Sequence, residues 1–265
     1  NSMTKKSLFT RTIAVILLVF AMLFSGCTLL EQKTPVNYPQ IVNTVTLDKM
    51  HGNIKIIATA KKTFGPWVTD KQSWQGSGII FADSDGYYYA LTNNHVIFND
   101  TNYSNFALTA VDYAGKEYSA DMVAAAASYD LALIKFKKSN NRLSVLTLRT
   151  TNPAVGEEII SIGQPLGQNN AITFGKVLGY EQITVGNATE EQSDVKFPAL
   201  KHDAPTESGS SGGAILDLSL NICAIHYAGS KTDSGDYVAG YAIQAEKIVE
   251  FLNGTGLVTI EQPAA

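Results

Sequence analysis

The residues most able to do chemistry stand in a glycine-rich turn directly before an apolar strand. Ser211 lies in the stretch 209–213, Gly-Ser-Ser-Gly-Gly. Glycine permits a tight turn and a close approach to a substrate carbonyl, so the N–H groups of Gly209 and Ser211 can converge on a developing oxyanion. Ser208 and Ser210 are competing hydroxyls, and such stretches are also common as plain turns. The Gly-x-Ser-Gly-Gly frame favours Ser211 as a nucleophile.

A serine hydroxyl is a weak nucleophile near neutral pH, so this interpretation requires a base and a group that orients the base. His95 ends one apolar strand, and Asp130 opens another. Asp112 and Asp121 are weaker candidates for the acid. The three groups therefore follow the chain order His95, Asp130, Ser211.

The same spacing of glycines around the serine also fits the nucleophile elbow of an α/β-hydrolase. That fold needs its acid and then its histidine after the serine. Only His226 follows Ser211 in this chain, and it does so closely. The order of the residues excludes the α/β-hydrolase fold.

Three segments together resemble the trypsin-like serine proteases, especially the bacterial HtrA-type proteases and the secreted glutamyl endopeptidases. They are Thr-Asn-Asn-His-Val at 92–96, Asp-Leu-Ala-Leu-Ile at 130–134 and Gly-Ser-Ser-Gly-Gly at 209–213. The stretches 156–167 and 173–177 also resemble HtrA-type strands and turns. The resemblance implies that the base is the histidine of the first segment, that the aspartate of the second orients it, and that Ser211 is the nucleophile.

Short apolar runs separated by glycine, asparagine and aspartate predict an all-β domain. The predicted strands are 54–58, 78–81, 87–91, 131–136, 158–162 and 214–216. One helix is predicted from Gln244 to Asn253, where apolar residues recur at helical spacing before Gly254. This pattern matches two six-stranded antiparallel barrels with a C-terminal helix, the fold that the resemblance implies. In that fold His95 and Asp130 come from the first barrel and Ser211 from the second.

A second set of residues bears on substrate choice. In the resembled fold, the strand with His226, Tyr227 and Gly229 lines the primary specificity pocket. Glutamyl endopeptidases carry a histidine at the position of His226 and a threonine five residues before the serine, where this chain has Thr206. Imidazole and hydroxyl groups suit a carboxylate, so we expect cleavage after Glu or Asp. The alternative is a structural His226 and a pocket for small aliphatic residues, as in HtrA-type proteases.

The N-terminus is typical of an export signal. Basic residues among the first eleven precede an apolar run over 13–24, and a serine and a glycine then lead to Cys27. This pattern resembles a bacterial lipoprotein signal in which Cys27 carries lipid. The run is short for a membrane span, although an uncleaved anchor is an alternative. Both readings place the enzyme at the bacterial cell membrane, on the extracytoplasmic side.

These features predict the domain organisation. Residues 1–26 are expected to be a signal peptide, with a vector remnant ahead of Met3, and residues 27–50 a lipidated N-terminus and tether. Residues 51–265 are expected to form the protease domain, with no PDZ domain after it.

Composition limits the other function classes. The chain has 265 residues, of which 45% are hydrophobic and 17% charged, which is enough apolar material for a sizeable core. Its net charge of −4 disfavours nucleic acid as a partner. The sequence has no metal-binding motif and indicates no cofactor. Of the two cysteines, Cys223 is expected to be a small buried hydrophobe.

Two functions are compatible with these observations. The first is a membrane-tethered serine endopeptidase that hydrolyses proteins or peptides through an acyl-enzyme. The second is a catalytically weak, peptide-binding lipoprotein. The presence of all three expected catalytic residues favours the first.

Overall fold

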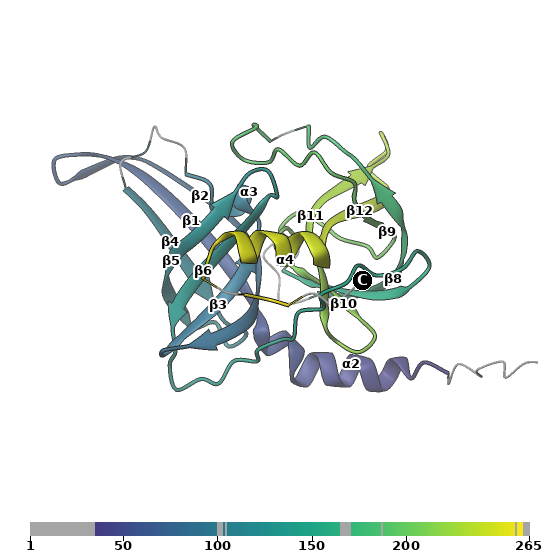
Figure 1. Cartoon of the computed structure of the whole chain (residues 1–265). Helices are drawn as coiled ribbons and strands as arrows, with labels where there is room; N and C mark the ends of the chain where they lie inside the picture. The colour runs from purple at the N-terminus through teal and green to yellow at the C-terminus, as the bar shows by residue number, and fades with distance from the viewer. Residues whose placement is uncertain are drawn as a thin grey trace, which may run out of the picture. The chain divides into compact units, whose positions relative to one another are not determined.

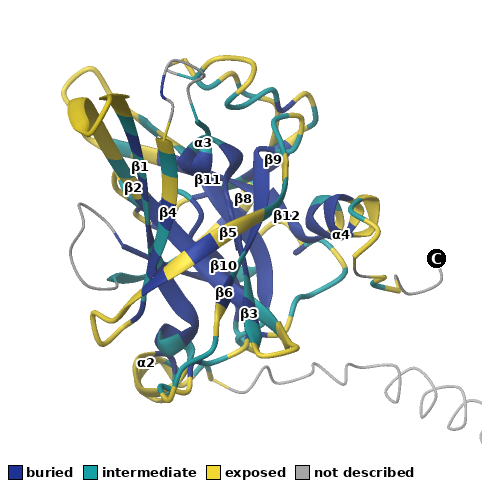
Figure 2. Ribbon diagram, turned by 90° about the vertical axis from the view of Figure 1, so that its left-hand side faces the viewer, coloured by how far each residue is buried: buried dark blue, intermediate teal, exposed yellow. Residues whose placement is uncertain are grey.

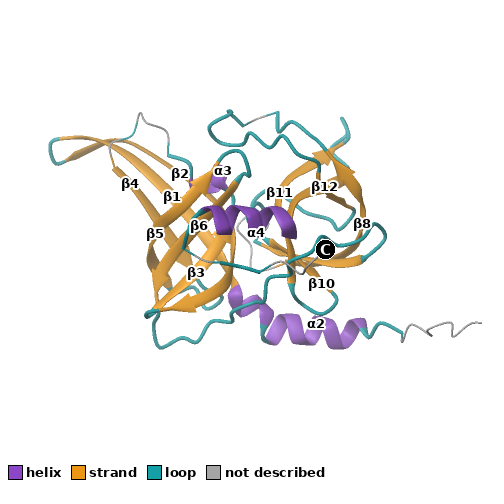
Figure 3. Cartoon of the chain, in the orientation of Figure 1, coloured by secondary structure: helices purple, strands orange, loops and turns teal. Residues whose placement is uncertain are grey.

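The computed structural model describes residues 35–99, 103, 105–164, 171–186, 188–257 and 259–261. Two closed antiparallel barrels of six strands each form its body, with strand orders β1-β2-β3-β6-β5-β4 and β10-β11-β12-β9-β8-β7 (Figures 1 and 3). The first barrel consists of β1 (Asn53–Phe64), β2 (Trp67–Ser84), β3 (Tyr87–Thr92), β4 (Asn105–Val111), β5 (Glu117–Ala126) and β6 (Leu131–Lys137). The second consists of β7 (Glu158–Gly163), β8 (Ala171–Glu181), β9 (Ala199–His202), β10 (Ala214–Asp217), β11 (Ile222–Lys231) and β12 (Tyr237–Gln244).

This architecture confirms the predicted fold class. Each of the six predicted strands lies within an observed strand, and the predicted C-terminal helix is α4 (Ala245–Gly254). Among the remaining strands, β4, β5 and β8 have few buried residues, and a strand with one face in water has a weaker apolar signal. Strand β11 is buried over its first six residues and is the strand expected from the resemblance to line the specificity pocket.

Apolar side chains fill each barrel and also the seam between them. One cluster contains residues of the first barrel only, and another contains residues of the second only. The third and largest cluster joins Leu91 and Leu133 of the first barrel to Ile160 and Ile225 of the second. Figure 2 shows this buried interior as a continuous dark region crossed by β6, β10 and β11. The seam fixes the two barrels relative to each other because close-packed side chains resist sliding.

The structure differs from the tether expected over residues 27–50. Helix α2 (Tyr38–Leu47) and the short 3-10 helix η1 (Lys49–Gly52) occupy its second half. Val45 is fully buried and belongs to the seam cluster, against which Ile41 packs at the (i, i+4) spacing of one helical face. Pro39 favours a segment without regular secondary structure, but proline is tolerated in the first turn of a helix.

The compact unit therefore begins at Pro39 rather than at residue 51. The expected signal peptide, the apolar run 13–24 and Cys27 lie outside the described residues. Within the described part of the chain, the helices are too short or too polar to cross a bilayer.

The position of Val45 predicts that α2 stabilises the two-barrel domain. Val45→Ala should lower the free energy of unfolding by about 2 kcal/mol, because it removes buried methyl groups and leaves a cavity. Val42→Ala on the same helix is the matched control, since Val42 is 37% exposed and should change stability by less than about 0.5 kcal/mol. Urea denaturation measures both. Equal values for the two variants would contradict a structural role for α2.

Candidate active site

His95 and Asp130 meet at one end of the first barrel. Helix α3 (Asn94–Ile97) is a single turn that follows β3 and carries His95. The Asp130 carboxylate contacts His95 twice, accepting from the backbone N–H over 3.0 Å and lying 2.8 Å from Nδ1 of the ring. Because an ionised carboxylate only accepts hydrogen bonds, Nδ1 carries the proton and Nε2 of the neutral ring is left as an acceptor.

The Asp130 backbone explains how this side chain reaches the histidine. Asp130 is fully buried and has a positive φ of 47°, an uncommon conformation that aspartate tolerates better than most residues. The side-chain amide of Asn93 donates to the Asp130 carbonyl over 2.8 Å. The Asp130 N–H donates to Ala127 O over 3.0 Å. These bonds close a tight turn that presents the carboxylate to α3.

The two alternative acids lie elsewhere. The Asp112 carboxylate accepts hydrogen bonds from the Ala114 and Lys116 N–H groups and from the Tyr118 hydroxyl, so it serves the turn between β4 and β5. Asp121 is exposed on β5.

The glycine-rich turn has the geometry expected of an oxyanion site. Gly209 has a φ of 94°, and the Ser210 N–H donates to Glu207 O over 3.0 Å, which closes a turn that requires a positive φ at its third position. Within the described chain, the Gly209 and Ser211 N–H groups donate to no other group. Ser210 is buried, whereas Ser211 is partly exposed. Two free donors thus flank an accessible hydroxyl.

Ser77 of β2 joins this turn to the first barrel. Its N–H donates to Ser211 O over 2.7 Å, and its hydroxyl donates to Gly209 O over 2.8 Å. The same hydroxyl accepts the Gln164 N–H over 2.8 Å, and Thr92 Oγ1 donates to Ser77 O over 2.7 Å. The sequence analysis missed Ser77, although its flanking glycines within a strand signal a close backbone approach.

Glycines make that approach possible. A Cβ on Gly212 would stand 2.0 Å from Ser77 O and 2.4 Å from Thr92 Oγ1. A Cβ on Gly76 would stand 2.6 Å from a Val96 methyl and 3.0 Å from Ser211 O. The Ser211 backbone therefore lies beside the residue that follows His95. Among the described residues no hydrogen bond joins His95 Nε2 to Ser211 Oγ, and such contacts are often long before substrate binds.

A pocket of about 370 Å³ opens beside Ser211. It is lined by Thr206, Glu207, Ser208, Ser211, His226, Ala228, Gly229, Ser230, Lys231 and Tyr237. Two backbone hydrogen bonds of 2.9 Å hold β11 against the serine turn. One runs from Gly212 N–H to His226 O, and the other from His226 N–H to Gly213 O. The structure thus brings Thr206, His226 and Gly229 together with the serine, as the sequence analysis expected.

Tyr227 is the exception among the expected pocket residues. Its side chain is 2% exposed and belongs to the seam cluster. Successive side chains of a strand point to opposite faces, so His226 at the pocket sends Tyr227 into the core. The Tyr227 side chain therefore does not line the described pocket, and only the backbone of this residue is available to a substrate there.

The sequence did not predict the contacts that His202 and Lys231 make around the pocket. The His202 ring is buried behind His226, with its Nε2 3.4 Å from His226 Nδ1. Burial lowers the pKa of His202 to about 4. Burial, and then the neighbouring His202 and His95, lower the pKa of His226 well below its usual value. At the rim, Lys231 Nζ lies 2.7 Å from the Glu207 carboxylate, so the charge of Glu207 is paired.

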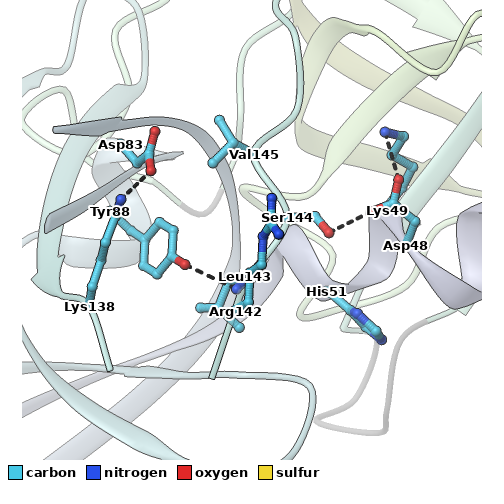
Figure 4. Close-up of a pocket in the computed structure, with 10 residues that line it drawn as sticks. All are labelled: Asp48, Lys49, His51, Asp83, Tyr88, Lys138, Arg142, Leu143, Ser144 and Val145. Carbon is cyan, nitrogen blue, oxygen red and sulfur yellow. Dashed lines mark hydrogen bonds and ion pairs between the residues drawn. The ribbon is translucent and has the colours of Figure 1, made fainter. Parts of the chain in front are cut away.

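A larger hollow of about 670 Å³ lies at the end of the first barrel where β2 turns into β3 (Figure 4). Its carboxylates, Asp48 and Asp83, form ion pairs with Lys49 and Lys138. The Ser144 hydroxyl donates to Asp48, and the ring of His51, which also lines the hollow, stacks on Tyr113 with 3.7 Å between the ring centroids. The described contacts therefore do not join this serine and histidine as a nucleophile and its base. Within the described residues, no cluster of three or more His, Cys, Asp or Glu side chains is arranged to hold a metal ion.

Comparisons with known proteins agree with this geometry. The model of the trypsin-like peptidase domain family matches residues 76–225. The chain is 29% identical over 178 residues to the probable periplasmic serine protease do/HhoA-like of Haemophilus influenzae, an alignment that covers 66% of this chain and 36% of that protein. It is 28% identical over 175 residues to the periplasmic serine endoprotease DegP of Escherichia coli (strain K12), with 65% of this chain and 34% of DegP covered.

The fold also resembles solved structures. The HtrA-type protease AlgW with decapeptide superposes with a TM-score of 0.62 and 23% sequence identity, covering 81% of this chain and 67% of that one. This likeness supports the two-barrel fold. The chain spans about a third of the length of the curated relatives described above.

The close approach at Gly212 yields a stability prediction. Gly212→Ala should lower the free energy of unfolding by more than about 4 kcal/mol, because a methyl group cannot fit against Ser77 O. Gly86→Ala is the matched control, since Gly86 has a similar φ of 81° but nothing within 4 Å of its Cβ position. It should cost only the backbone strain of about 1 kcal/mol. If urea denaturation gave equal losses, the serine turn would not be docked as described.

Proposed function

This chain belongs to the trypsin-like peptidase family, and from that premise we propose that it is a serine endopeptidase with Ser211 as nucleophile, His95 as general base and Asp130 as the acid that orients the base. The observation that carries the proposal is the 2.8 Å contact between His95 Nδ1 and the fully buried Asp130 carboxylate. A buried carboxylate fixes the ring and stabilises the imidazolium that forms during reaction.

The proposed reaction uses the geometry in a fixed order. His95 Nε2 accepts the Ser211 hydroxyl proton while Oγ bonds to the substrate carbonyl carbon. The carbonyl oxygen becomes an oxyanion that accepts hydrogen bonds from the N–H groups of Gly209 and Ser211. His95 then donates the proton to the leaving nitrogen as the C–N bond breaks, which leaves an acyl-enzyme. Water, activated by the same base, hydrolyses the ester and restores Ser211.

We propose that the pocket accepts Glu or Asp before the scissile bond. Most of the lining side chains carry polar groups, and Ala228 is the one aliphatic side chain among the described lining residues. Because Lys231 pairs with Glu207, that carboxylate repels an acidic substrate less than an unpaired one would. With their pKa values lowered, His202 and His226 are both neutral at pH 7 in the empty pocket, and an entering carboxylate favours protonation of His226.

The proposed location is the extracytoplasmic side of the bacterial membrane, with lipid on Cys27. The basic and apolar N-terminal pattern of the sequence supports it. The curated relatives are named periplasmic, which fits an exported enzyme. The proposed partner is a protein or peptide substrate, and the AlgW structure holds a decapeptide.

The role of Ser211 can be tested by labelling with a fluorophosphonate. The unaltered protein should label, and Ser211→Ala should abolish the label, because a fluorophosphonate reacts with a serine that a base activates. Ser208→Ala is the matched control in the same turn and should still label. Asp130→Asn should lower kcat by roughly 10⁴-fold through the wrong histidine tautomer. Absence of label on the unaltered, folded protein would instead support a peptide-binding lipoprotein.

The pocket assignment can be tested with matched peptides carrying Glu, Gln or Val before the scissile bond. Glu should exceed Gln in kcat/KM by roughly tenfold, since a charge-assisted hydrogen bond is worth more than a neutral one. The Glu/Gln ratio should be higher at about pH 6 than at about pH 8, because protonation of His226 is favoured at low pH. His226→Gln should remove most of this preference. Equal or faster cleavage of the Val peptide would instead support a pocket for small aliphatic residues.

A further inference from the structure

The hairpin of β1 and β2 extends well beyond the first barrel. Strand β1 pairs with β4 only as far as Lys61, and beyond it the described residues of the two hairpin strands form backbone pairs only with each other. Side-chain hydrogen bonds from Tyr103 to Asp70 and from Asn105 to Thr63 still reach this part of the hairpin. Figure 1 shows the hairpin projecting from the barrel, and Figure 2 shows its end as exposed. An isolated two-stranded ribbon is only marginally stable in water.

Large apolar side chains gather at the end of this ribbon. Phe64 and Trp67 form the last cross-strand pair and are 79% and 73% exposed, and the neighbouring Val68 is 55% exposed. Three such side chains in contact with water at one convex tip favour an apolar partner.

Lysines lie behind the apolar tip. Lys61 and Lys71 are direct cross-strand neighbours, and Lys62 stands opposite Asp70. Lys61 precedes Phe64 by three residues, a distance of roughly 10 Å along an extended strand. That spacing matches the depth between lipid headgroups and the outer acyl chains.

The geometry points to the β1–β2 hairpin tip as a surface that inserts into an anionic lipid bilayer. Phe64, Trp67 and Val68 enter the interfacial region, and Lys61, Lys62 and Lys71 lie among the headgroups. Aromatic residues prefer this interface, and basic residues near it are attracted to anionic lipids. The apolar run 13–24 of the sequence also indicates a chain that works at a membrane.

The shape of the tip disfavours a protein partner. Aromatic side chains bury about 150–250 Å² each, so the tip offers less than roughly 600 Å² in all. A stable protein interface buries roughly 800 Å² on each partner. A bilayer needs no complementary surface, so a small convex tip is sufficient for it.

Trp67 itself supplies the test, because the chain has only two tryptophans. In a Trp74→Phe background, Trp67 emission should shift to the blue with phosphatidylglycerol vesicles and be quenched by lipids brominated in their acyl chains. Phosphatidylcholine vesicles should give a weaker effect. If Trp74→Phe fails to fold, the difference between the unaltered chain and Trp67→Phe gives the same signal. The N-terminal segment is identical in every variant, so it contributes equally to all measurements.

Substitutions of the lysines and of the apolar tip residues test separately whether charge and apolar contact drive insertion. Lys62→Glu and Lys71→Glu should each weaken Trp67 insertion by at least roughly fivefold. Phe64→Ser should reduce quenching by brominated lipid, whereas Val238→Ser, which removes a 51% exposed valine from β12, should not. These variants should cleave a short soluble peptide at the same rate as the unaltered protein. If the unaltered protein failed to cleave that peptide, the result would count against the proposed function and not against membrane insertion.

Two results would overturn the inference. One is Trp67 emission that anionic vesicles leave unchanged. The other is a blue shift that depends on protein concentration without lipid, because the tip would then bind a second copy of this chain.

Discussion

The structure depends on the contact that Ser77 makes across the seam between the two barrels. His95 and Asp130 belong to the first barrel and Ser211 to the second, so neither barrel can assemble the site alone. Ser77 bonds to the carbonyl groups of Gly209 and Ser211, the two residues whose N–H groups are the proposed oxyanion donors. One residue of the first barrel thus holds the backbone at both of these residues, through the peptide units that follow them.

The close packing around this contact explains why the turn is rich in glycine. Gly212 allows Ser77 O to approach within a distance that any side chain would prevent. The backbone of β11 is held against the same turn by the bonds from Gly212 N–H to His226 O and from His226 N–H to Gly213 O. The nucleophile, the oxyanion donors and the wall of the pocket therefore share one rigid framework. Such a framework limits reorganisation during reaction, which is the basis of electrostatic stabilisation of a transition state.

The pocket has two buried histidines in its interior and an ion pair at its rim. His202 and His226 lie in contact beneath the pocket, and burial keeps both rings neutral when it is empty. Two adjacent imidazolium ions would repel each other strongly in that environment, so at most one of the two rings is expected to gain a second proton. In the proposed function, a substrate carboxylate supplies the compensating charge for that proton. The ion pair of Lys231 with Glu207 reduces the opposing charge at the entrance.

The sequence was most informative where function resides in short stretches. The residues around His95, Asp130 and Ser211 predicted the fold, which is confirmed, and the structure brings His95 and Asp130 into contact, while the catalytic roles of the three side chains stay a prediction. Helix α2 was missed because its one fully buried side chain, Val45, is defined only by distant contacts with the seam. Ser77 was missed for the same reason, since its partner Gly209 lies 132 residues away. Tyr227 was placed in the pocket by resemblance, although strand alternation directs its side chain into the core.

The most direct test of this account is a crystal structure of the protein after reaction with a peptidyl phosphonate. The account predicts a phosphorus bond to Ser211 Oγ, His95 Nε2 close to that oxygen, and a phosphonyl oxygen about 3 Å from the N–H groups of Gly209 and Ser211. Ser77 should keep its bonds to the turn. An adduct on another serine, or a phosphonyl oxygen directed away from those two N–H groups, would contradict the assignment.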